Sequence, residues 1–471
     1  MIKLIDFFDA FNIRIANVNT QMLAEATIDS RRVLPGSIFF AIKGDRVDGH
    51  QYIPQAIANG AQLIVMDHET ACDLPVLDLE KVNTSDILDI SDMPFAVKVP
   101  GTLQAMQRIA SHQRKIIDPH VIGITGSVGK SSTKELVAEV LAQRYHTHKN
   151  PGNYNNEIGL PLTLINSGYG HECVVLEMGF YYPGEIQFLC GIAAPQVGIV
   201  TNIGTVHAER AGSQQVIAKG KAELVQALPA DGIAILNYDD ALVRPMAEKT
   251  IASVLYYGLT PQAHLWADNI QGKGLQGITF DLHYEGMKFH IQAPLLGRHS
   301  VQTILRASAA GLALGMTWEA IIQGLQKGHT QLRLVTVRTE SGALILDDTY
   351  NATPESMIAA LGLLHELKGH KIAVLGDMLE LGEYEELGHA QVGKYAAGVV
   401  NHLVTVGQLG KMIARTANEA GLAENAITSV NNSAEAVELL KYNLGQDDVV
   451  LIKGSHGLRM DTIAAALEQT L

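Results

Sequence analysis

The chain has 471 residues, of which 47% are hydrophobic and 18% are charged. This length exceeds what one hydrophobic core supports, so about two to four domains are expected. A formal net charge of −14 argues against a nucleic-acid-binding surface. No apolar run is long enough to span a bilayer and the first residues are not a signal peptide, so a cytoplasmic protein is expected. Three cysteines, Cys72, Cys173 and Cys190, are too few and too widely spaced for a disulfide framework or a zinc site, and buried thiols are expected.

Residues 1 to 97 form the first predicted domain, which mixes short strands with a helix. The apolar pattern predicts strands at 37–42 and 63–66 and a helix at 53–59. Two polar loops flank the first of these strands, Thr27-Ile-Asp-Ser-Arg-Arg32 and Gly44-Asp-Arg-Val-Asp-Gly-His50. Their basic residues and glycines suit a phosphorylated ligand but do not identify it.

The most informative stretch is Val121-Ile-Gly-Ile-Thr-Gly-Ser-Val-Gly-Lys-Ser-Ser-Thr-Lys134. It begins as a buried β-branched strand and ends in residues with helical apolar spacing. A glycine loop between strand and helix presents backbone N–H groups to a polyphosphate, while Lys130 would reach the outer phosphates and Ser131 would hold a magnesium ion. The pattern is the short form Gly126-x-x-Gly129-Lys130-Ser131, because Ile124 replaces the usual first glycine. A plain strand-to-helix turn is the alternative.

The rest of the second predicted domain, residues 98 to 329, indicates a doubly wound α/β core followed by an antiparallel hairpin. Strands are predicted at 173–177 and 197–201, the hairpin at 277–284 and 287–292, and helices at 103–114, at 134–141, at 299–314 and from 318.

Polar residues follow several of these strands, at the edge where open α/β sheets bind ligands. One such segment is Asn153-Tyr-Asn-Asn-Glu-Ile-Gly159. Glu177 ends a strand and suits a second magnesium ligand, with a helix-capping carboxylate as the alternative. His207 lies in a loop after another strand, where an ordinary surface or hydrogen-bonded histidine is the alternative. Lys221, taken by itself, would be a solvated lysine on a helix.

Residues 330 to 471 form the third predicted domain, a parallel sheet of Rossmann type with strands at 343–346, 371–375, 402–406 and 448–452. Asp347-Asp-Thr-Tyr-Asn-Ala352 follows the first strand, and its paired carboxylates repel unless a cation or hydroxyl compensates. Lys453-Gly-Ser-His-Gly-Leu-Arg459 follows the last strand and is typical of an anion clamp. A ligand site is expected in the cleft between the second and third domains.

Taken in order, these segments resemble the Mur ligases, the ATP-dependent amide-forming enzymes of peptidoglycan synthesis. The resemblance covers nearly the whole chain with the family's spacing and rests on residues 29–31, 48–50, 125–131, 155–159, 177–179, 201–204, 207, 347–352, 375–382 and 453–455. The segments at 347–352 and 375–382 resemble the member that adds a dipeptide rather than a single amino acid.

The resemblance implies an α/β protein of three domains. These are a small α/β N-terminal domain for the UDP-substrate, a central P-loop-type ATPase domain with a mostly parallel sheet plus a small antiparallel sheet, and a C-terminal Rossmann-like domain on the amine-substrate side. It further implies that ATP, with Mg²⁺, phosphorylates a substrate carboxylate and that D-alanyl-D-alanine attacks the acyl phosphate, which joins the dipeptide to UDP-N-acetylmuramoyl-tripeptide. A monomer without nucleic-acid partners or membrane insertion is expected.

The resemblance also implies residue roles. Catalytic roles fall on Lys130, His207, Lys221, Arg333 and Asp348. Cofactor binding falls on Gly126, Ser127, Val128, Gly129, Lys130, Ser131, Ser132, Asn156, His299, Arg333 and Asp348. Substrate binding falls on Ser30, Arg31, Lys43, Gly44, His50, Tyr350, Asn351, Lys453 and Arg459. Magnesium binding falls on Ser131, Glu177, His207 and, if it is carbamylated, Lys221.

Two alternatives remain open. Another Mur-type ligase would use a different amine donor, and a regulatory P-loop ATPase or kinase would not need the loops around Ser30, Arg31 and His50. The adenine contacts are also open, because relatives often carry asparagines where this chain has Ser300 and Thr303, and a hydroxyl lacks the paired donor and acceptor of an amide. The third residue of the tripeptide, diaminopimelate or lysine, is not indicated.

Overall fold

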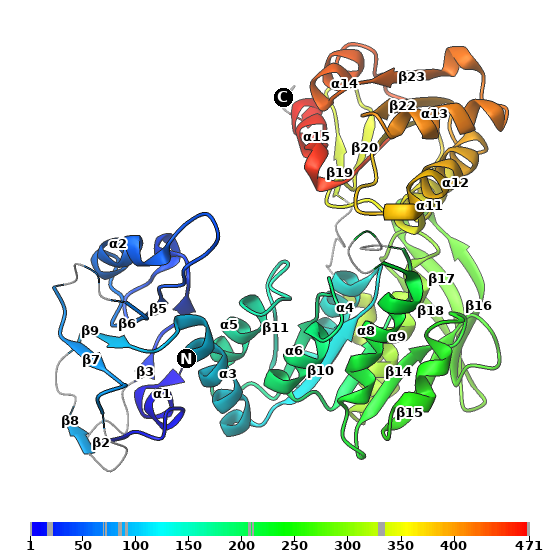
Figure 1. Ribbon diagram of the computed structural model, residues 1–471. Coiled ribbons are helices and arrows are strands. Elements are labelled where there is room, and N and C mark those ends of the chain that lie inside the picture. The colour runs from blue at the N-terminus through cyan, green and yellow to red at the C-terminus, as the bar shows by residue number, and fades with distance from the viewer. Residues whose placement is uncertain are drawn as a thin grey trace. The chain divides into compact units, whose positions relative to one another are not determined.

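A computed structural model of the protein describes residues 2–16, 22–68, 70, 73–82, 87–89, 93–205, 209, 212–327 and 335–468 (Figure 1). The chain divides into two compact units. The first consists of residues 1–123, 145–179 and 186–197, and the second of residues 124–144, 180–185 and 198–471. Within the described ranges, no helix is both long and apolar enough to cross a membrane. The predicted domain boundaries at 97/98 and 329/330 stay predictions, and the second falls outside the described residues.

The N-terminal part is built on a five-stranded sheet in the order β4-β5-β6-β9-β7, with every neighbouring pair parallel. Its strands are β4 Ala26–Thr27, β5 Ile38–Phe40, β6 Leu63–Met66, β7 Val76–Asp78 and β9 Phe95–Lys98. Around them lie α1 Leu4–Asp9, η1 Ser30–Arg32, η2 Gly49–Tyr52 and α2 Ile53–Ala58, with the two-stranded pairs β1 Ile2–Lys3 and β3 Met22–Leu23, and β2 Arg14–Ala16 and β8 Ile87–Asp89. Parallel strands are covered on both faces, which explains why β6 is an uninterrupted apolar run.

The central sheet has nine strands in the order β11-β12-β10-β13-β14-β15-β16-β17-β18. They are β10 His120–Thr125, β11 Thr147–Lys149, β12 Cys173–Glu177, β13 Val197–Val200, β14 Ile233–Asn237, β15 Ser253–Gly258, β16 Leu265–Gly272, β17 Ile278–Tyr284 and β18 Met287–Ala293. The last three strands are antiparallel, as predicted for the hairpin. Its turn is Glu285-Gly286, and both residues have positive φ, at 49° and 79°, the backbone of a tight two-residue hairpin turn.

Helices flank this sheet: α3 Thr102–Ile117, α4 Lys130–Leu141, α5 Gly159–Asn166, α6 Glu185–Ala193, α8 Gln214–Gln226, α9 Ser300–Ala313 and α10 Trp318–Lys327. Helix α4 packs against α9 and α10. Helix α9 also packs on β15 and β16, so it contacts both the phosphate-loop helix and the sheet. The short 3₁₀ helices are η3 Arg244–Lys249 and η4 Gly274–Gln276.

The C-terminal part is a six-stranded sheet in the order β19-β20-β24-β21-β22-β23, in which only β19 pairs antiparallel. Its strands are β19 Val335–Arg338, β20 Leu344–Asp347, β21 His370–Gly376, β22 His402–Val406, β23 Ile427–Val430 and β24 Asp448–Lys453. The helices are α11 Pro354–Glu366, α12 Glu385–Ala397, α13 Gly410–Glu419, α14 Ser433–Leu440 and α15 Asp461–Glu468, with η5 Gly382–Tyr384, η6 Glu424–Ala426 and η7 His456–Leu458. Successive residues enter cores on opposite faces, as Val374 and Leu375 do, which confirms the predicted doubly wound arrangement.

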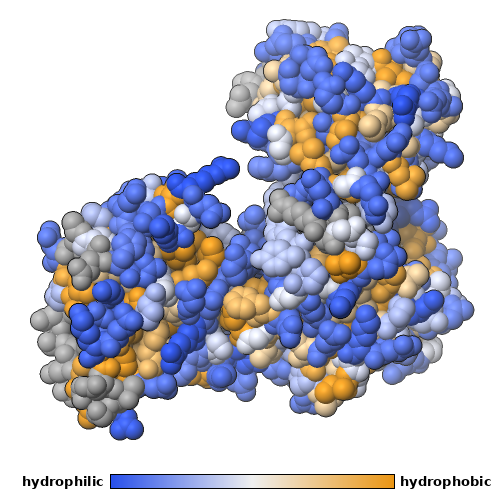
Figure 2. All heavy atoms as spheres, viewed as in Figure 1, coloured by the Kyte–Doolittle hydropathy of each residue, from blue (hydrophilic) through white to orange (hydrophobic). Residues whose placement is uncertain are grey.

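The two described cysteines agree with the sequence-based expectation. The face shown in Figure 2 is mainly hydrophilic, and apolar residues appear on it as separate patches. Cys173 and Cys190 are free, buried thiols, as predicted. Burial raises the pKa of Cys173 to about 12, so this thiol is unreactive at neutral pH. Cys72 lies outside the described residues.

Candidate active site

The predicted phosphate loop connects β10 to α4, and two of its positions require glycine. Gly126 has φ +146° and Gly129 has φ +83°, a region that other L-residues avoid. A Cβ at Gly126 would overlap the Thr201 hydroxyl, so a side chain there would break the contact between the loop and the next strand. The predicted strand, glycine loop and helix are confirmed.

Thr201 and Asn202, which directly follow β13, hold the loop in place. The Asn202 amide makes two hydrogen bonds with the Val128 backbone, at 2.9 Å to the N–H and 3.0 Å to the carbonyl. The Thr201 hydroxyl donates to the same carbonyl at 2.7 Å. In the sequence, these two residues stand out only through family likeness and as part of the segment that leads to His207. The available signal was the place of Thr201 and Asn202 at the end of a predicted strand, where open α/β sheets bind ligands.

Two lysines donate to the loop's carbonyl oxygens. Lys130 Nζ lies 2.8 Å from the Gly126 carbonyl and 3.2 Å from that of Ser127. Lys221 Nζ, from α8, lies 2.9 Å from the Gly126 carbonyl and 4.9 Å from the centre of the Phe180 ring. The structure therefore brings together two of the predicted catalytic residues.

The expectation of a solvated Lys221 from its own residue type was wrong, because its side chain is only 2% exposed. The reason is helical periodicity. Lys221 follows the buried Ile217 by four positions and precedes the buried Leu224 by three, so it belongs to the apolar face of α8. A lysine on that face has to find polar partners inside the protein.

Glu177, at the carboxyl end of β12, is 2% exposed and oriented by two asparagines. Asn155 donates to its Oε1 at 2.9 Å, and Asn150 makes hydrogen bonds with both its backbone N–H and its carbonyl. Asn156 caps α5, since its Oδ1 accepts from Gly159 N at 2.9 Å. Its predicted cofactor contact stays a prediction.

In the C-terminal part, Lys453 supplies the cation that the Asp347-Asp348 pair requires. Its ammonium group is 2.7 Å from Asp348 Oδ2 and 2.8 Å from the Asn351 carbonyl, and its side chain is 2% exposed. Arg459 instead forms an exposed ion pair with Asp461 at 3.2 Å. The two ends of the predicted anion clamp therefore differ, with one cation buried and one at the surface.

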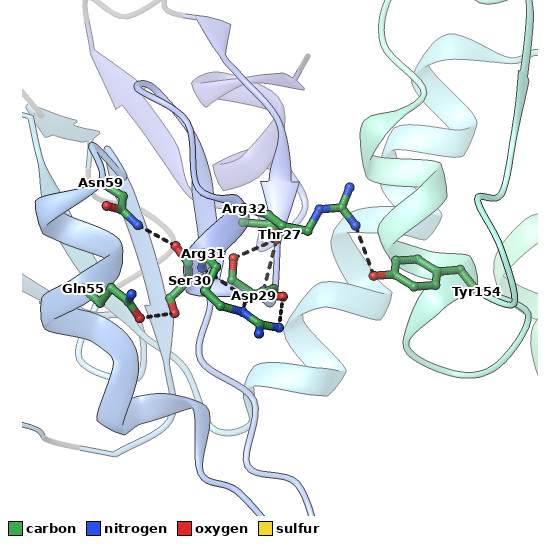
Figure 3. A network of polar contacts seen from close by, with 8 residues as sticks. All are labelled: Thr27, Asp29, Ser30, Arg31, Arg32, Gln55, Asn59 and Tyr154. Atoms are coloured by element: carbon green, nitrogen blue, oxygen red, sulfur yellow. Dashed lines mark hydrogen bonds and ion pairs between the residues drawn. The ribbon is translucent and has the colours of Figure 1, made fainter. Parts of the chain in front are cut away.

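The loop at Asp29–Arg32 is a compact network (Figure 3). Arg31 binds Asp29 through two hydrogen bonds, at 2.9 and 2.7 Å, and these bonds hold the pKa of Asp29 below its usual value. Ser30 is buried and donates to Gln55 at 2.7 Å. Figure 3 shows Arg32 extending away from Asp29 to the Tyr154 hydroxyl, at 3.4 Å. Ser30 thus fixes the loop, while Arg31 remains exposed.

His50 fixes the second loop of this part. Its Nδ1–H donates to Asp48 at 2.7 Å and its Nε2 accepts from Asp67 N–H at 3.2 Å, which sets the tautomer. The rings of His50 and His68 stack at 3.7 Å. Asp48, His50 and His68 come close enough to share a metal ion, but both nitrogens of His50 are already engaged. Lys43 and Gly44 lie in the exposed part of this loop.

His207 and Arg333, two of the predicted catalytic residues, lie outside the described residues.

Comparison with known proteins identifies the family. The chain matches the Mur ligase family catalytic domain at residues 24–114, the Mur ligase middle domain at 124–311 and the Mur ligase glutamate ligase domain at 332–456. The chain belongs to the Mur ligase family.

Two curated relatives show how far the likeness extends. The UDP-N-acetylmuramoyl-tripeptide–D-alanyl-D-alanine ligase of Bacillus subtilis (strain 168) is 32% identical over 93% of this chain and 92% of its own length. That of Escherichia coli (strain K12) is 32% identical over 95% and 94%.

Solved structures of related proteins share the fold of this chain over nearly its whole length. MurF from Acinetobacter baumannii superposes with a TM-score of 0.81 at 28% identity, covering 98% of both chains. MurF from Thermotoga maritima in complex with ADP superposes with a TM-score of 0.77 at 27% identity, covering 95% of this chain and 97% of that one. The three-domain α/β prediction is confirmed.

Against the Mur ligase pattern, the structure shows what this chain's departures at α9 do. Ser300 donates to the Leu296 carbonyl at 2.6 Å, and Thr303 accepts from Arg306 at 2.8 Å. Both hydroxyls are therefore engaged within the protein. The neighbouring His299 is exposed, and its predicted cofactor contact stays a prediction.

Proposed function

We propose that this Mur ligase is the ATP-dependent enzyme that joins D-alanyl-D-alanine to UDP-N-acetylmuramoyl-tripeptide in peptidoglycan synthesis. The observation that carries the proposal is the likeness to relatives of that activity, which are 32% identical over 93% and 95% of this chain. It is combined with a phosphate loop on which Lys130 and Lys221 converge. The ADP complex of the Thermotoga relative supports ATP as the nucleotide.

The chemistry requires activation of a carboxylate, because a free carboxylate is a poor acyl donor at neutral pH. Transfer of the γ-phosphoryl group to it creates an acyl phosphate, and the dipeptide amine then displaces phosphate through a tetrahedral intermediate. Loop N–H groups and Lys130 would stabilise the charge that moves during phosphoryl transfer. Lys130 would first exchange its carbonyl partners for phosphate oxygens.

Magnesium fits the available donors. Mg²⁺ prefers hard oxygen ligands, and the Glu177 carboxylate stands at a strand end with one oxygen oriented by Asn155. Ser131, in the first turn of α4, offers a hydroxyl. When bound, the ion would neutralise part of the polyphosphate charge, and a carbamylated Lys221 would extend the ligand set.

Substrate roles follow from exposure. Arg31 and the loop at Lys43 and Gly44 would meet the UDP-substrate, while Ser30 and His50 would hold these loops in shape. Tyr350, Asn351 and Arg459, which are exposed, would line the amine-substrate side, where the buried Lys453 would hold Asp348 and Asn351 in place. We further propose a cytoplasmic monomer.

Phosphate release in the presence of ATP, UDP-N-acetylmuramoyl-tripeptide and D-alanyl-D-alanine tests the proposal. Release that requires both other substrates supports it. Release without the dipeptide would instead indicate an ATPase, and release with a different amine only would indicate another Mur-type ligase.

A further inference from the structure

Arg306, in the middle of α9, is a buried arginine that the sequence did not single out. Its side chain is 3% exposed. One end of the guanidinium, Nη2, donates to the Thr303 hydroxyl at 2.8 Å, and the other, Nη1, to the Tyr257 hydroxyl at 3.3 Å. These contacts fix where the guanidinium points.

It points at the phosphate loop. A Cβ built on Gly129 would lie 3.1 Å from Arg306 Nη2, so the guanidinium packs directly on the glycine that precedes Lys130. A second connection runs through Tyr257, whose hydroxyl donates to the Thr201 carbonyl at 2.8 Å. Thr201 in turn holds the Val128 carbonyl. Arg306 therefore reaches the loop both directly and through the strand that supports it.

The charge of Arg306 has no anionic partner. Among the residues that the structure describes, no carboxylate forms an ion pair with it, and its Nε is buried without a hydrogen-bond acceptor. Burying an unpaired charge is unfavourable unless another group compensates. Lys453, equally buried, shows the usual solution, a carboxylate at 2.7 Å. Because Arg306 lies beside the phosphate loop, the phosphates of a bound ligand would supply this anion.

We propose that Arg306 is a positioning residue of the nucleotide site, and that its buried charge acts across Gly129 on the phosphates of a bound nucleoside diphosphate or triphosphate. It holds the loop open to the anion and offsets the anion's charge, while contributing little to the base or ribose. The inference rests on the proposed nucleotide-dependent function. The alternative is a purely structural role, in which Arg306 joins α9 to β15 through Tyr257.

Arg306→Met removes the charge and retains an apolar side chain of considerable length. ADP and adenosine affinities are measured by calorimetry for the wild type and the variant, together with the melting temperature of each protein with and without ADP. Arg144→Met is the matched control, because Arg144 is an exposed arginine beyond the other end of α4. Should the methionine variant fail to fold, Arg306→Gln removes the charge but retains polar atoms for Thr303.

We expect ADP affinity to fall about 10- to 100-fold, the usual worth of a hydrogen bond to a charged group, with adenosine affinity unchanged. The ligand-free melting temperature should stay the same or rise, because an uncompensated charge is gone, while the shift caused by ADP shrinks. Two results would overturn the inference in favour of the structural role. One is wild-type ADP affinity in the variant. The other is an equal loss of affinity for ADP and adenosine together with a lower ligand-free melting temperature. A wild type that binds no ADP would refute the nucleotide-dependent function itself.

Discussion

Basic side chains at the two proposed ligand-binding regions are held in different ways. In the N-terminal loops, Arg31 is paired with the carboxylate of Asp29 and the neutral His50 donates its Nδ1–H to Asp48, in each case two residues away. Around the phosphate loop, Lys130 and Lys221 donate to backbone carbonyls, and Arg306 donates to hydroxyls. A carboxylate neutralises a cation before any ligand arrives, whereas the hydroxyls that accept from Arg306 leave its charge in place. Arg306 is therefore prepared for an anion beside the phosphate loop, whereas Arg31 must give up Asp29 to bind one.

The largest effect should come from Lys130→Ala. The lysine's charge would act on the transferred phosphoryl group, so we expect turnover to fall at least about 1,000-fold. The side chain is half-buried at the first residue of α4, and the melting temperature should change little. Steady-state kinetics and thermal unfolding check both expectations, with the exposed Lys327→Ala as control. Near-native turnover in the folded variant would remove the phosphate loop from the mechanism.

Lys221→Ala should be the next largest, with an expected loss of about 100-fold if a carbamate on this lysine supports a second metal ion. Carbamate forms on a neutral amine, which burial favours. High bicarbonate should not restore the variant, but short carboxylic acids should restore part of its activity, because they supply the missing carboxylate. Lys219→Ala is a close control, since Lys219 is exposed on the same helix two residues away. Full activity in Lys221→Ala would assign this residue a packing role only.

A smaller effect is expected at the N-terminal loops. Arg31→Ala removes an exposed cation that must leave Asp29 before it contacts a substrate phosphate, and part of the gain is lost in that exchange. We expect the KM for UDP-N-acetylmuramoyl-tripeptide to rise about tenfold with kcat nearly unchanged, in keeping with a charged hydrogen bond of modest net strength. Arg32→Ala, which loses the contact with Tyr154 and the ion pair with Glu25, should change KM less. A larger effect of Arg32 would reverse the assignment within this loop.

What could be predicted from the sequence depends on whether the residues concerned are neighbours in the chain. Strands such as β12 and β22 were predicted to the residue, because buried parallel strands are continuous apolar runs. The phosphate loop was visible because its glycines and Lys130 are neighbours in the chain. The contact of Lys221 with the Gly126 carbonyl spans 95 residues, so only family likeness pointed to Lys221. Asn202 was noted only as part of the family-like segment 201–204, and Arg306 had no pointer in the sequence. Contacts between residues far apart in the chain depend on which strands and helices pack together, and residue spacing does not encode this packing.

The smallest effect tests the N-terminal loops through pH. The N–H of His50 and its ring hold the pKa of Asp48 below the usual 3.8, so the folded state favours the carboxylate. Such a group contributes stability above its unfolded pKa and loses that contribution as the pH falls through the folded pKa. Asp48→Asn should therefore lower the unfolding free energy by about 1 kcal/mol at most at pH 6 to 7, since the site is partly exposed to solvent. The difference from wild type should shrink below about pH 4 and approach zero in stronger acid. Urea unfolding at a series of pH values measures it, with Asp45→Asn, an exposed carboxylate of the same loop, as control. A difference that grows as the pH falls would mean that the protonated form of Asp48 is the one this loop prefers, and the local-carboxylate account of the N-terminal loops would then be wrong.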